Sequence, residues 1–180
     1  TPEFKASFRT PFQLVVPLAM IWCGWRWLME IGPGLEGQNI DVEAPEFADA
    51  SAEVARTMPA FLAEIDKHVD NAFVKFPMVT DEGVTEHIWA YVHHYAHGVF
   101  NVSLACTPYT QKGPVETRRD VPEAEVEDWQ IMLPDGRIRG GFSIRAAFRY
   151  LDRTGVKMNR TLRKQRAQLM DEGSGLTSFE

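Results

Sequence analysis

A hydrophobic run from Phe12 to Met29 constrains this chain most, because Gln13 and Arg26 are its only strongly polar side chains. A membrane-spanning helix needs about 20 predominantly apolar residues to cross a hydrocarbon core about 30 Å thick. The run approaches this length, and Arg26 is close enough to its end for the guanidinium to reach the headgroups. The same end carries a tryptophan cluster typical of a membrane interface, namely Trp22, Trp25 and Trp27. The sequence therefore predicts one N-terminal transmembrane helix.

Two features of this helix favour contact with other protein subunits. Pro17 interrupts its hydrogen bonding, and Ala19 and Cys23, four residues apart, would let another helix approach one face. We interpret the segment as a docking helix. The alternatives are a helix buried in protein, a secretory signal peptide and an amphipathic surface helix; the last two fit less well, since no small-residue cleavage site follows the run and it is apolar all round. The residues assigned to anchoring and helix packing are Phe12, Pro17, Ala19, Trp22, Cys23, Trp25, Arg26 and Trp27.

The charges that flank the run indicate its orientation. Lys5 and Arg9 precede it and an acidic stretch follows it, so the positive-inside rule favours a cytoplasmic N-terminus. We therefore expect a single-pass protein of the bacterial inner membrane, with its globular domain in the periplasm.

Charge is distributed in two blocks along the chain. Residues 30–66 carry nine acidic side chains and one basic side chain, whereas residues 153–166 carry six basic side chains and no acid. Such blocks are typical of solvated faces or of docking surfaces for an oppositely charged partner. The formal net charge of -6 argues against a nucleic-acid-binding protein. The patterns divide the chain into a tail and membrane helix (1–31), an acidic linker (32–49), an α+β domain (50–152) and a basic helix and tail (153–180).

Hydrophobic periodicity in the rest of the chain changes from helical to alternating and back. Apolar residues three or four apart predict a helix over 50–69, with Ser51 as a cap and a break near Thr57 because of Pro59. Alternation predicts strands, and Asp135-Gly136 marks a hairpin turn. The strands are expected at 72–78, 86–94, 99–105, 123–133 and 137–142, and helices follow at 143–151 and 156–170. This order predicts an α+β fold in which helices flank a small, curled antiparallel sheet.

The histidines of the chain do not predict a metal site. His93, His94 and His97 are close in sequence, and neutral imidazoles are good metal ligands. However, adjacent strand residues point to opposite faces of a sheet, so His93 and His94 do not converge easily, and His97 falls in an expected turn. We expect hairpin histidines that face solvent, no metal and no cofactor.

The candidates for acid–base catalysis are two neighbouring acids, Glu127 and Asp128. Paired carboxylates can do such work when their environments separate their pKa values. On a strand the two side chains point in opposite directions, which argues against a cooperating pair. We expect Trp129 to fill the core, one of the acids to hold a turn or to meet Arg145, and the chain not to be an enzyme.

A set of short motifs resembles a known family. In chain order the motifs are Pro59–Leu62, Glu86–Trp89, Gly98–Val102, Lys112-Gly113, Val126–Trp129 and Gly140–Arg145. Over about residues 50–151 they resemble the bacterial YegJ-like family of domains of unknown function. The resemblance implies an α+β fold and often an exported or membrane-linked context. It implies no established reaction.

Together these features predict a non-catalytic accessory subunit of a bacterial membrane protein complex, respiratory or photosynthetic, that contacts other membrane-protein subunits. The alternative is a free-standing, membrane-tethered envelope domain that binds a peptide or small ligand through Trp89, Tyr91 and Tyr109. The basic helix offers a further surface for anionic headgroups or an acidic neighbour. Its residues are Arg160, Arg163, Lys164 and Arg166.

Overall fold

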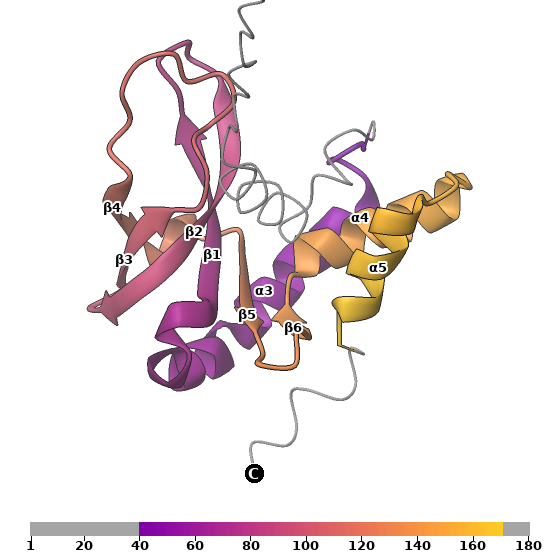
Figure 1. Cartoon of the computed structure of the whole chain (residues 1–180), viewed down its shortest axis with the longest axis horizontal. Coiled ribbons are helices and arrows are strands. Elements are labelled where there is room, and N and C mark those ends of the chain that lie inside the picture. The colour runs from indigo at the N-terminus through magenta and orange to yellow at the C-terminus, as the bar shows by residue number, and fades with distance from the viewer. Residues whose placement is uncertain (1–39, 171–180) are drawn as a thin grey trace, which may run out of the picture.

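The computed structural model describes residues 40–170, which form an antiparallel sheet of six strands with three helices (Figure 1). The sheet order is β4-β3-β2-β1-β5-β6, so β5 pairs with β1 although three strands intervene in sequence. The strands are β1 (Ala72–Val79), β2 (Thr85–Ala96), β3 (Val99–Leu104), β4 (Arg118–Pro122), β5 (Asp128–Met132) and β6 (Ile138–Gly140). The helices are α3 (Pro45–Glu64), α4 (Phe142–Thr154) and α5 (Arg160–Gln168).

Helix α3 is longer than the sequence predicts at its N-terminal end. It begins at Pro45, where a proline is favourable because the first helical N–H groups have no partner inside the helix. Residues 45–49 therefore belong to the helix and not to the expected acidic linker. The helix also continues through Pro59, so the predicted break is wrong, and Ser51 does not cap it, since the Ser51 hydroxyl donates to the Phe47 carbonyl within the helix.

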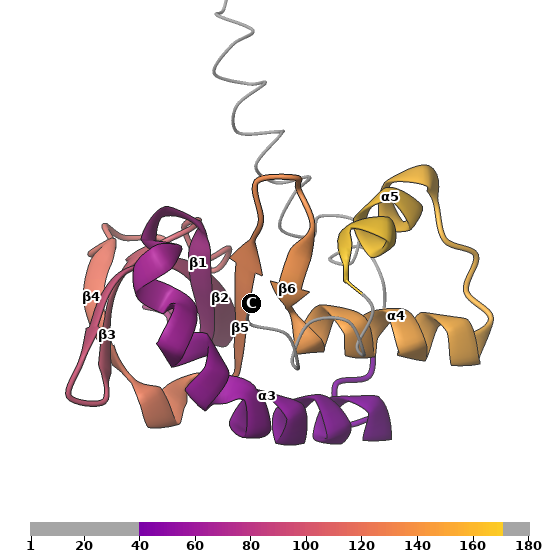
Figure 2. The same cartoon turned by 90° about the horizontal axis from the view of Figure 1, so that it is seen from below.

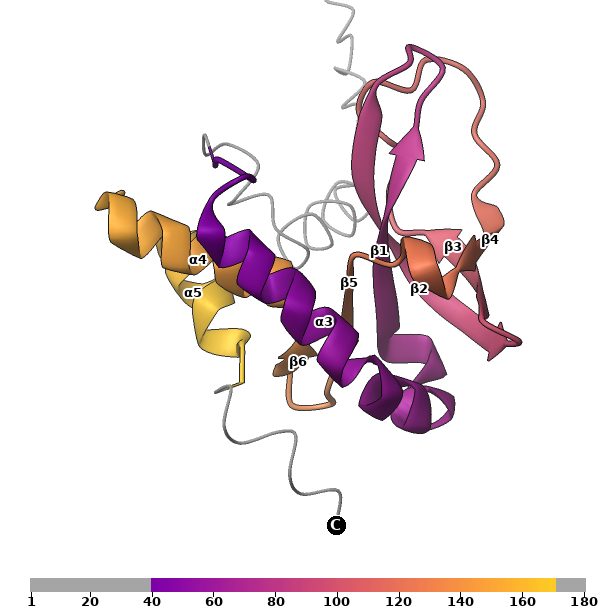
Figure 3. The ribbon, with the colours of Figure 1, turned by 180° about the vertical axis from the view of Figure 1, so that it is seen from behind.

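One face of the sheet packs against α3, which crosses in front of β5 in Figure 3. Alternate strand residues supply this core, including Val74, Phe76, Ile88 and Ala90, as the period of two requires. Trp129 on β5 stacks on Phe61 of α3 with ring centroids 4.8 Å apart and meets Phe142 edge-on at 5.6 Å. The predicted core position of Trp129 is confirmed, since 1% of this residue is exposed.

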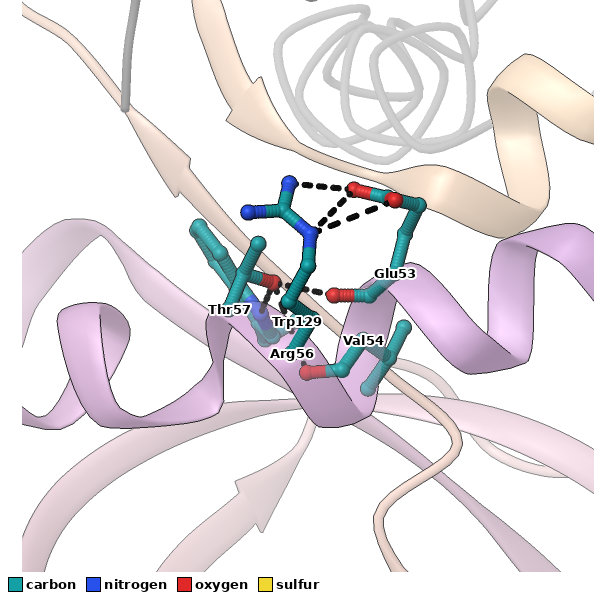
Figure 4. Close-up of polar contacts among 5 residues, drawn as sticks. All are labelled: Glu53, Val54, Arg56, Thr57 and Trp129. Atoms are coloured by element: carbon teal, nitrogen blue, oxygen red, sulfur yellow. Dashed lines mark hydrogen bonds and ion pairs between the residues drawn. The ribbon is translucent and has the colours of Figure 1, made fainter. Parts of the chain in front are cut away.

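A hydrogen-bond relay joins Trp129 to the backbone of α3 (Figure 4). The Trp129 Nε1–H donates to Thr57 Oγ1 over 3.0 Å, and the Thr57 hydroxyl donates to the Glu53 carbonyl over 2.6 Å. The buried indole N–H therefore has an acceptor, which a tryptophan in a core requires. On the solvent side of the same turn, Arg56 pairs with the Glu53 carboxylate.

The remaining helices form a lobe beside β6, where α5 stacks on α4 (Figure 2). A second buried cluster combines Phe73 and Trp89 from the sheet with Phe148 and Leu151 of α4 and Leu162 of α5. Helices α3 and α4 also lie side by side, and Arg153 near the end of α4 pairs with Glu46 near the start of α3. The basic helix thus belongs to the folded domain, although it was predicted as a separate C-terminal segment.

Four strands lie within a few residues of their predicted positions, namely β1, β2, β3 and β6. The predicted turn between β2 and β3 is formed by His97-Gly98, whose φ angles are 52° and 79°. The predicted strand over 123–133 is wrong in its first half, since Glu123–Glu125 is a short 3-10 helix and β5 begins at Asp128. Strand β4 was not predicted at all. The segment from β4 to β5 crosses the end of the sheet.

The membrane part of the predicted fold class is wrong for the structure described. Within residues 40–170, no helix combines the length and the apolar character needed to cross a membrane. Each helix in this range instead carries charged side chains on its exposed side, for example Arg56 on α3 and Lys164 on α5. The fold class is corrected to α+β with a six-stranded antiparallel sheet. The predicted spanning segment, residues 12–29, lies outside the described residues, and so do all the residues assigned above to anchoring and helix packing.

Candidate functional site

The turn between β1 and β2 holds a long loop, residues 105–117, through two carboxylates. Glu86 at the start of β2 accepts hydrogen bonds from the backbone N–H groups of Tyr109 (2.7 Å) and Thr110 (2.6 Å) and from the Thr110 hydroxyl (2.6 Å). Thr110 also lies 3.0 Å from the Thr80 hydroxyl at the end of β1. The backbone around Tyr109 is therefore fixed by the hairpin and not by its own secondary structure.

The second carboxylate, Asp81, holds the other half of the loop. Its oxygens accept from the backbone N–H groups of Lys112 (3.0 Å) and Gly113 (2.6 Å). A Cβ atom at position 113 would lie 3.0 Å from Asp81 Oδ2, so a larger residue there would push the carboxylate away. Lys112 also pairs with Glu82 across the turn. We call this arrangement of Asp81 and Glu86 the carboxylate latch.

The latch presents an exposed apolar tip. Tyr109 is 96% exposed, and Val79 and Val84 of the adjoining hairpin are 68% and 43% exposed. A tyrosine this exposed on a backbone held by hydrogen bonds has already lost the backbone freedom that binding would otherwise remove. We call Val79, Val84 and Tyr109 the hairpin tip.

The latch predicts acid sensitivity of the loop. Hydrogen bonds from the loop backbone lower the pKa of Asp81; for Glu86, burial raises the pKa, but the bonds from Thr110 and Tyr109 outweigh it and the net pKa is lowered. A carboxylate whose pKa is lowered by folding stabilises the closed loop at pH values above its ordinary pKa. This stabilisation is lost as the pH falls through the lowered pKa. We expect the amide resonances of Tyr109, Thr110, Lys112 and Gly113 to shift upfield together on acidification in NMR spectra.

The matched control for this titration is Glu86→Gln. The Tyr109 and Thr110 amide shifts should then no longer change with pH, while those of Lys112 and Gly113 should still follow Asp81. Amide shifts that stay constant until the whole domain unfolds would contradict the role of the latch.

The structure does not bring the three predicted aromatic contacts together on one open surface. Trp89 is buried, with 8% exposed, and Tyr91 packs on Phe73 with ring centroids 4.6 Å apart. Only Tyr109 is exposed. Trp89 and Tyr91 therefore support the sheet core, and an interaction surface in this region has Tyr109 as its aromatic side chain.

The predicted basic residues lie on the outer side of α5. Asn159 caps this helix by accepting from the Leu162 N–H over 2.8 Å, and Leu162 is fully buried. The exposed side carries Arg160, Arg163 and Lys164, while Arg166 pairs with Asp152 of α4 at 2.7 Å. The four residues do share an exposed surface, but Arg166 is engaged with α4 and the Arg163 Nε donates to the Asn159 carbonyl within the helix start.

An open groove of about 1010 Å³ runs along α3. One wall is the helix itself, with Phe47, Ala50, Val54 and Met58 at successive helical turns. The opposite wall is the crossover from β4 to β5, which contributes Pro122, Ala124 and Val126. We call it the α3 groove, and sequence reasoning did not find it because its walls are more than 60 residues apart in the chain.

Polar side chains line part of this groove without forming a catalytic set. The His87 Nδ1 lies 2.6 Å from Glu127 Oε2, and both side chains are partly exposed. Ser143 also lines the groove, but it is bonded to the buried Asp128. The groove residues thus show no serine or cysteine paired with a histidine base, which nucleophilic catalysis would require.

Asp128 has a structural role in the domain. Its carboxylate accepts from the backbone N–H groups of Trp129 (2.8 Å), Phe142 (3.1 Å) and Ser143 (2.7 Å), so it caps the start of α4 from strand β5. Glu127 faces the groove while Asp128 is fully buried, and the predicted separation of the two acids is confirmed. Asp128 holds a helix start, and it does not meet Arg145, whose Nε instead donates to the Gly140 carbonyl.

The histidines are engaged separately. The His93 Nε2 lies 2.6 Å from the Ser103 hydroxyl on the neighbouring strand, His94 is exposed, and His97 occupies the hairpin turn. Across residues 40–170 no three His, Cys, Asp or Glu side chains are grouped so that they could hold a metal ion.

No known protein family, curated protein or solved structure matches the chain, and the resemblance to the YegJ-like family stays a prediction.

Proposed function

We propose that this chain is a non-catalytic accessory subunit whose α+β domain docks on a larger protein assembly through the hairpin tip. The observation that carries the proposal is the exposure of Tyr109, 96%, on a backbone that Glu86 fixes with two hydrogen bonds. Binding hot spots are enriched in tyrosine, and fixing them before binding reduces the entropy lost on association.

The non-catalytic part of the proposal is supported by how the titratable side chains are used. Asp128 caps a helix, Glu86 and Asp81 hold a loop, and Glu127 pairs with His87. Each of these carboxylates is committed to a contact within the domain.

The host that we propose is the bacterial membrane complex indicated by the sequence. That part of the proposal, with the periplasmic location of the domain, rests on residues outside 40–170. The hairpin tip provides a way to test the docking step without reference to those residues.

The test is purification of the full chain from native membranes in mild detergent, comparing wild type with Tyr109→Ala. Wild type should migrate with a larger complex in stoichiometric amount. Loss of a hot-spot side chain costs about 2 kcal/mol or more of binding free energy, or roughly a thirtyfold lower affinity, so Y109A should run mostly at its own mass. Its free energy of unfolding should change by less than about 0.5 kcal/mol, because the side chain is exposed.

The matched control is Val156→Ala, which removes an exposed apolar side chain (39% exposed) after α4 and away from the tip. It should co-migrate like wild type. A wild-type chain that runs alone would overturn the accessory-subunit proposal, and equal co-migration of Y109A would overturn the role of the tip.

A further inference from the structure

The α3 groove is a second surface that the proposed docking step does not use, since it shares no residue with the hairpin tip. Its helical wall spans the three turns from Phe47 to Met58, about 17 Å at the rise of an α-helix. That length fits a partner segment of about three helical turns and exceeds what a small metabolite would fill. The groove is also open along one side, as a site for a chain segment must be.

Both walls of the groove carry apolar side chains. Phe47 and Val126 are only partly buried, and Val42 at one end is 67% exposed. Opposed apolar walls with room between them match the helix-in-groove mode of peptide recognition, in which anchors at helical spacing enter the groove.

The charges along the groove are mainly negative. Glu43 and Glu123 line it, and Glu127 lies beside His87. The Tyr95 hydroxyl donates to Glu123, and this bond raises the pKa of Tyr95, so the phenol keeps its proton and adds no positive charge to the groove. Among the lining residues that belong to the described part of the chain, 40–170, Lys75 is the one lysine or arginine.

A backbone acceptor adds to this pattern. Pro59 has no N–H, so the Ala55 carbonyl lacks the donor that the helix would normally supply four residues later. Ala55 is itself exposed and lines the groove. The groove therefore offers carboxylate and carbonyl acceptors, which a partner with cationic donors would satisfy.

We propose that the α3 groove binds an amphipathic segment of a partner protein that carries Lys or Arg beside its apolar anchors. The apolar walls supply burial for the anchors, and the surplus of acceptors selects a basic segment over an acidic one.

The test is fluorescence anisotropy with the full chain and a labelled 14-residue amphipathic peptide of leucine and lysine. Matched peptides replace every lysine with glutamate or glutamine. The protein variants are Ala55→Arg, which places bulk and positive charge in the groove, and Ala52→Arg, which makes the same change at an exposed position of α3 outside the groove. Both variants should fold, because arginine is favourable in exposed helix positions.

We expect wild type and A52R to bind the leucine–lysine peptide alike, and A55R to bind it at least tenfold more weakly. The glutamate peptide should not bind. Equal binding by A55R and A52R would show attraction to the net negative charge alone and would overturn the site. If the glutamine peptide bound as tightly as the lysine peptide, the selection of basic segments would be overturned. If wild type and A52R self-associated and A55R did not, the occupant of the groove would be a second copy of this chain and not a partner protein.

Discussion

Replacing Trp129 with alanine should lower the free energy of unfolding by about 3–5 kcal/mol, the range for an aromatic side chain removed from a core. Trp129 is 1% exposed and packs between Phe61 of α3 and Phe142 at the start of α4. Its removal leaves a cavity between the sheet and two helices and also takes the donor from Thr57. Since a domain of this kind is stable by only about 5–15 kcal/mol, this loss is a large fraction of its total stability.

Urea denaturation measures this loss, and two variants divide it into parts. Trp129→Phe keeps an aromatic ring between its neighbours but removes the Nε1–H, and Thr57→Val removes the acceptor while keeping the shape of the side chain. Each should cost about 1–2 kcal/mol. A loss below about 1 kcal/mol for W129A would show that Trp129 is not central to the core.

Replacing Asp128 with alanine should cost about 3 kcal/mol. The carboxylate accepts three backbone hydrogen bonds at the junction of β5 and α4, and the N–H groups of Trp129 and Phe142 are buried there. A buried donor that loses its acceptor bears the full cost of its desolvation. Helix α4 should fray at its start, which amide exchange of Ser143 and the following turn would report. Unchanged stability would contradict the capping role.

The pH dependence of Asp128 has the opposite sign to that of the latch. Burial raises its pKa, while bonds from Ser143, Phe142 and Trp129 lower it without cancelling the effect of burial. The folded state then binds the proton more tightly than the unfolded state, so this group stabilises the fold more as the pH falls through the raised pKa. Relative to Asp128→Asn, wild type should gain stability on acidification. A relative loss would show that the hydrogen bonds outweigh burial.

The sequence predicts the parts of the fold whose cause is local. Alternation of Val74, Phe76 and Met78 with polar or exposed neighbours predicts β1, and similar patterns predict β2 and β3. The start of α3 was missed because its first turn is acidic and resembles the stretch before it. Glu46 is stabilised there by Arg153, 107 residues away, a contact that no local pattern reveals.

Strand β4 was missed for a similar reason. Its sequence, RRDVP, carries three charges and a proline, which is typical of a loop. It becomes a strand because Val121 packs beside Phe100 and the backbone pairs with β3. Charges and proline are common on a sheet edge, where they discourage pairing with other chains.

For the candidate site, the sequence identifies Tyr109 but not the reason for its exposure. Glu86 and Tyr109 are 23 residues apart, and Asp81 and Gly113 are 32 apart. A carboxylate that accepts backbone bonds from a distant loop has no sequence motif. A Cβ atom at position 113 would lie against the Asp81 carboxylate, a close approach that no local pattern of the sequence shows.

The position of β5 in the sheet bears on how the chain can be made in a cell. β1 pairs with β2 on one side and with β5 on the other, and β5 follows β1 by about 50 residues in the chain. At synthesis rates of 5–20 residues per second, the β5-facing edge of β1 stays open for roughly 3–10 s after β1 is made. During that interval the nascent chain offers the apolar residues Ala72–Val74 to any neighbouring strand. Slowed translation between residues 80 and 127 would lengthen this exposure, so aggregation of the newborn chain should respond to codon choice there even though the folded protein is unchanged.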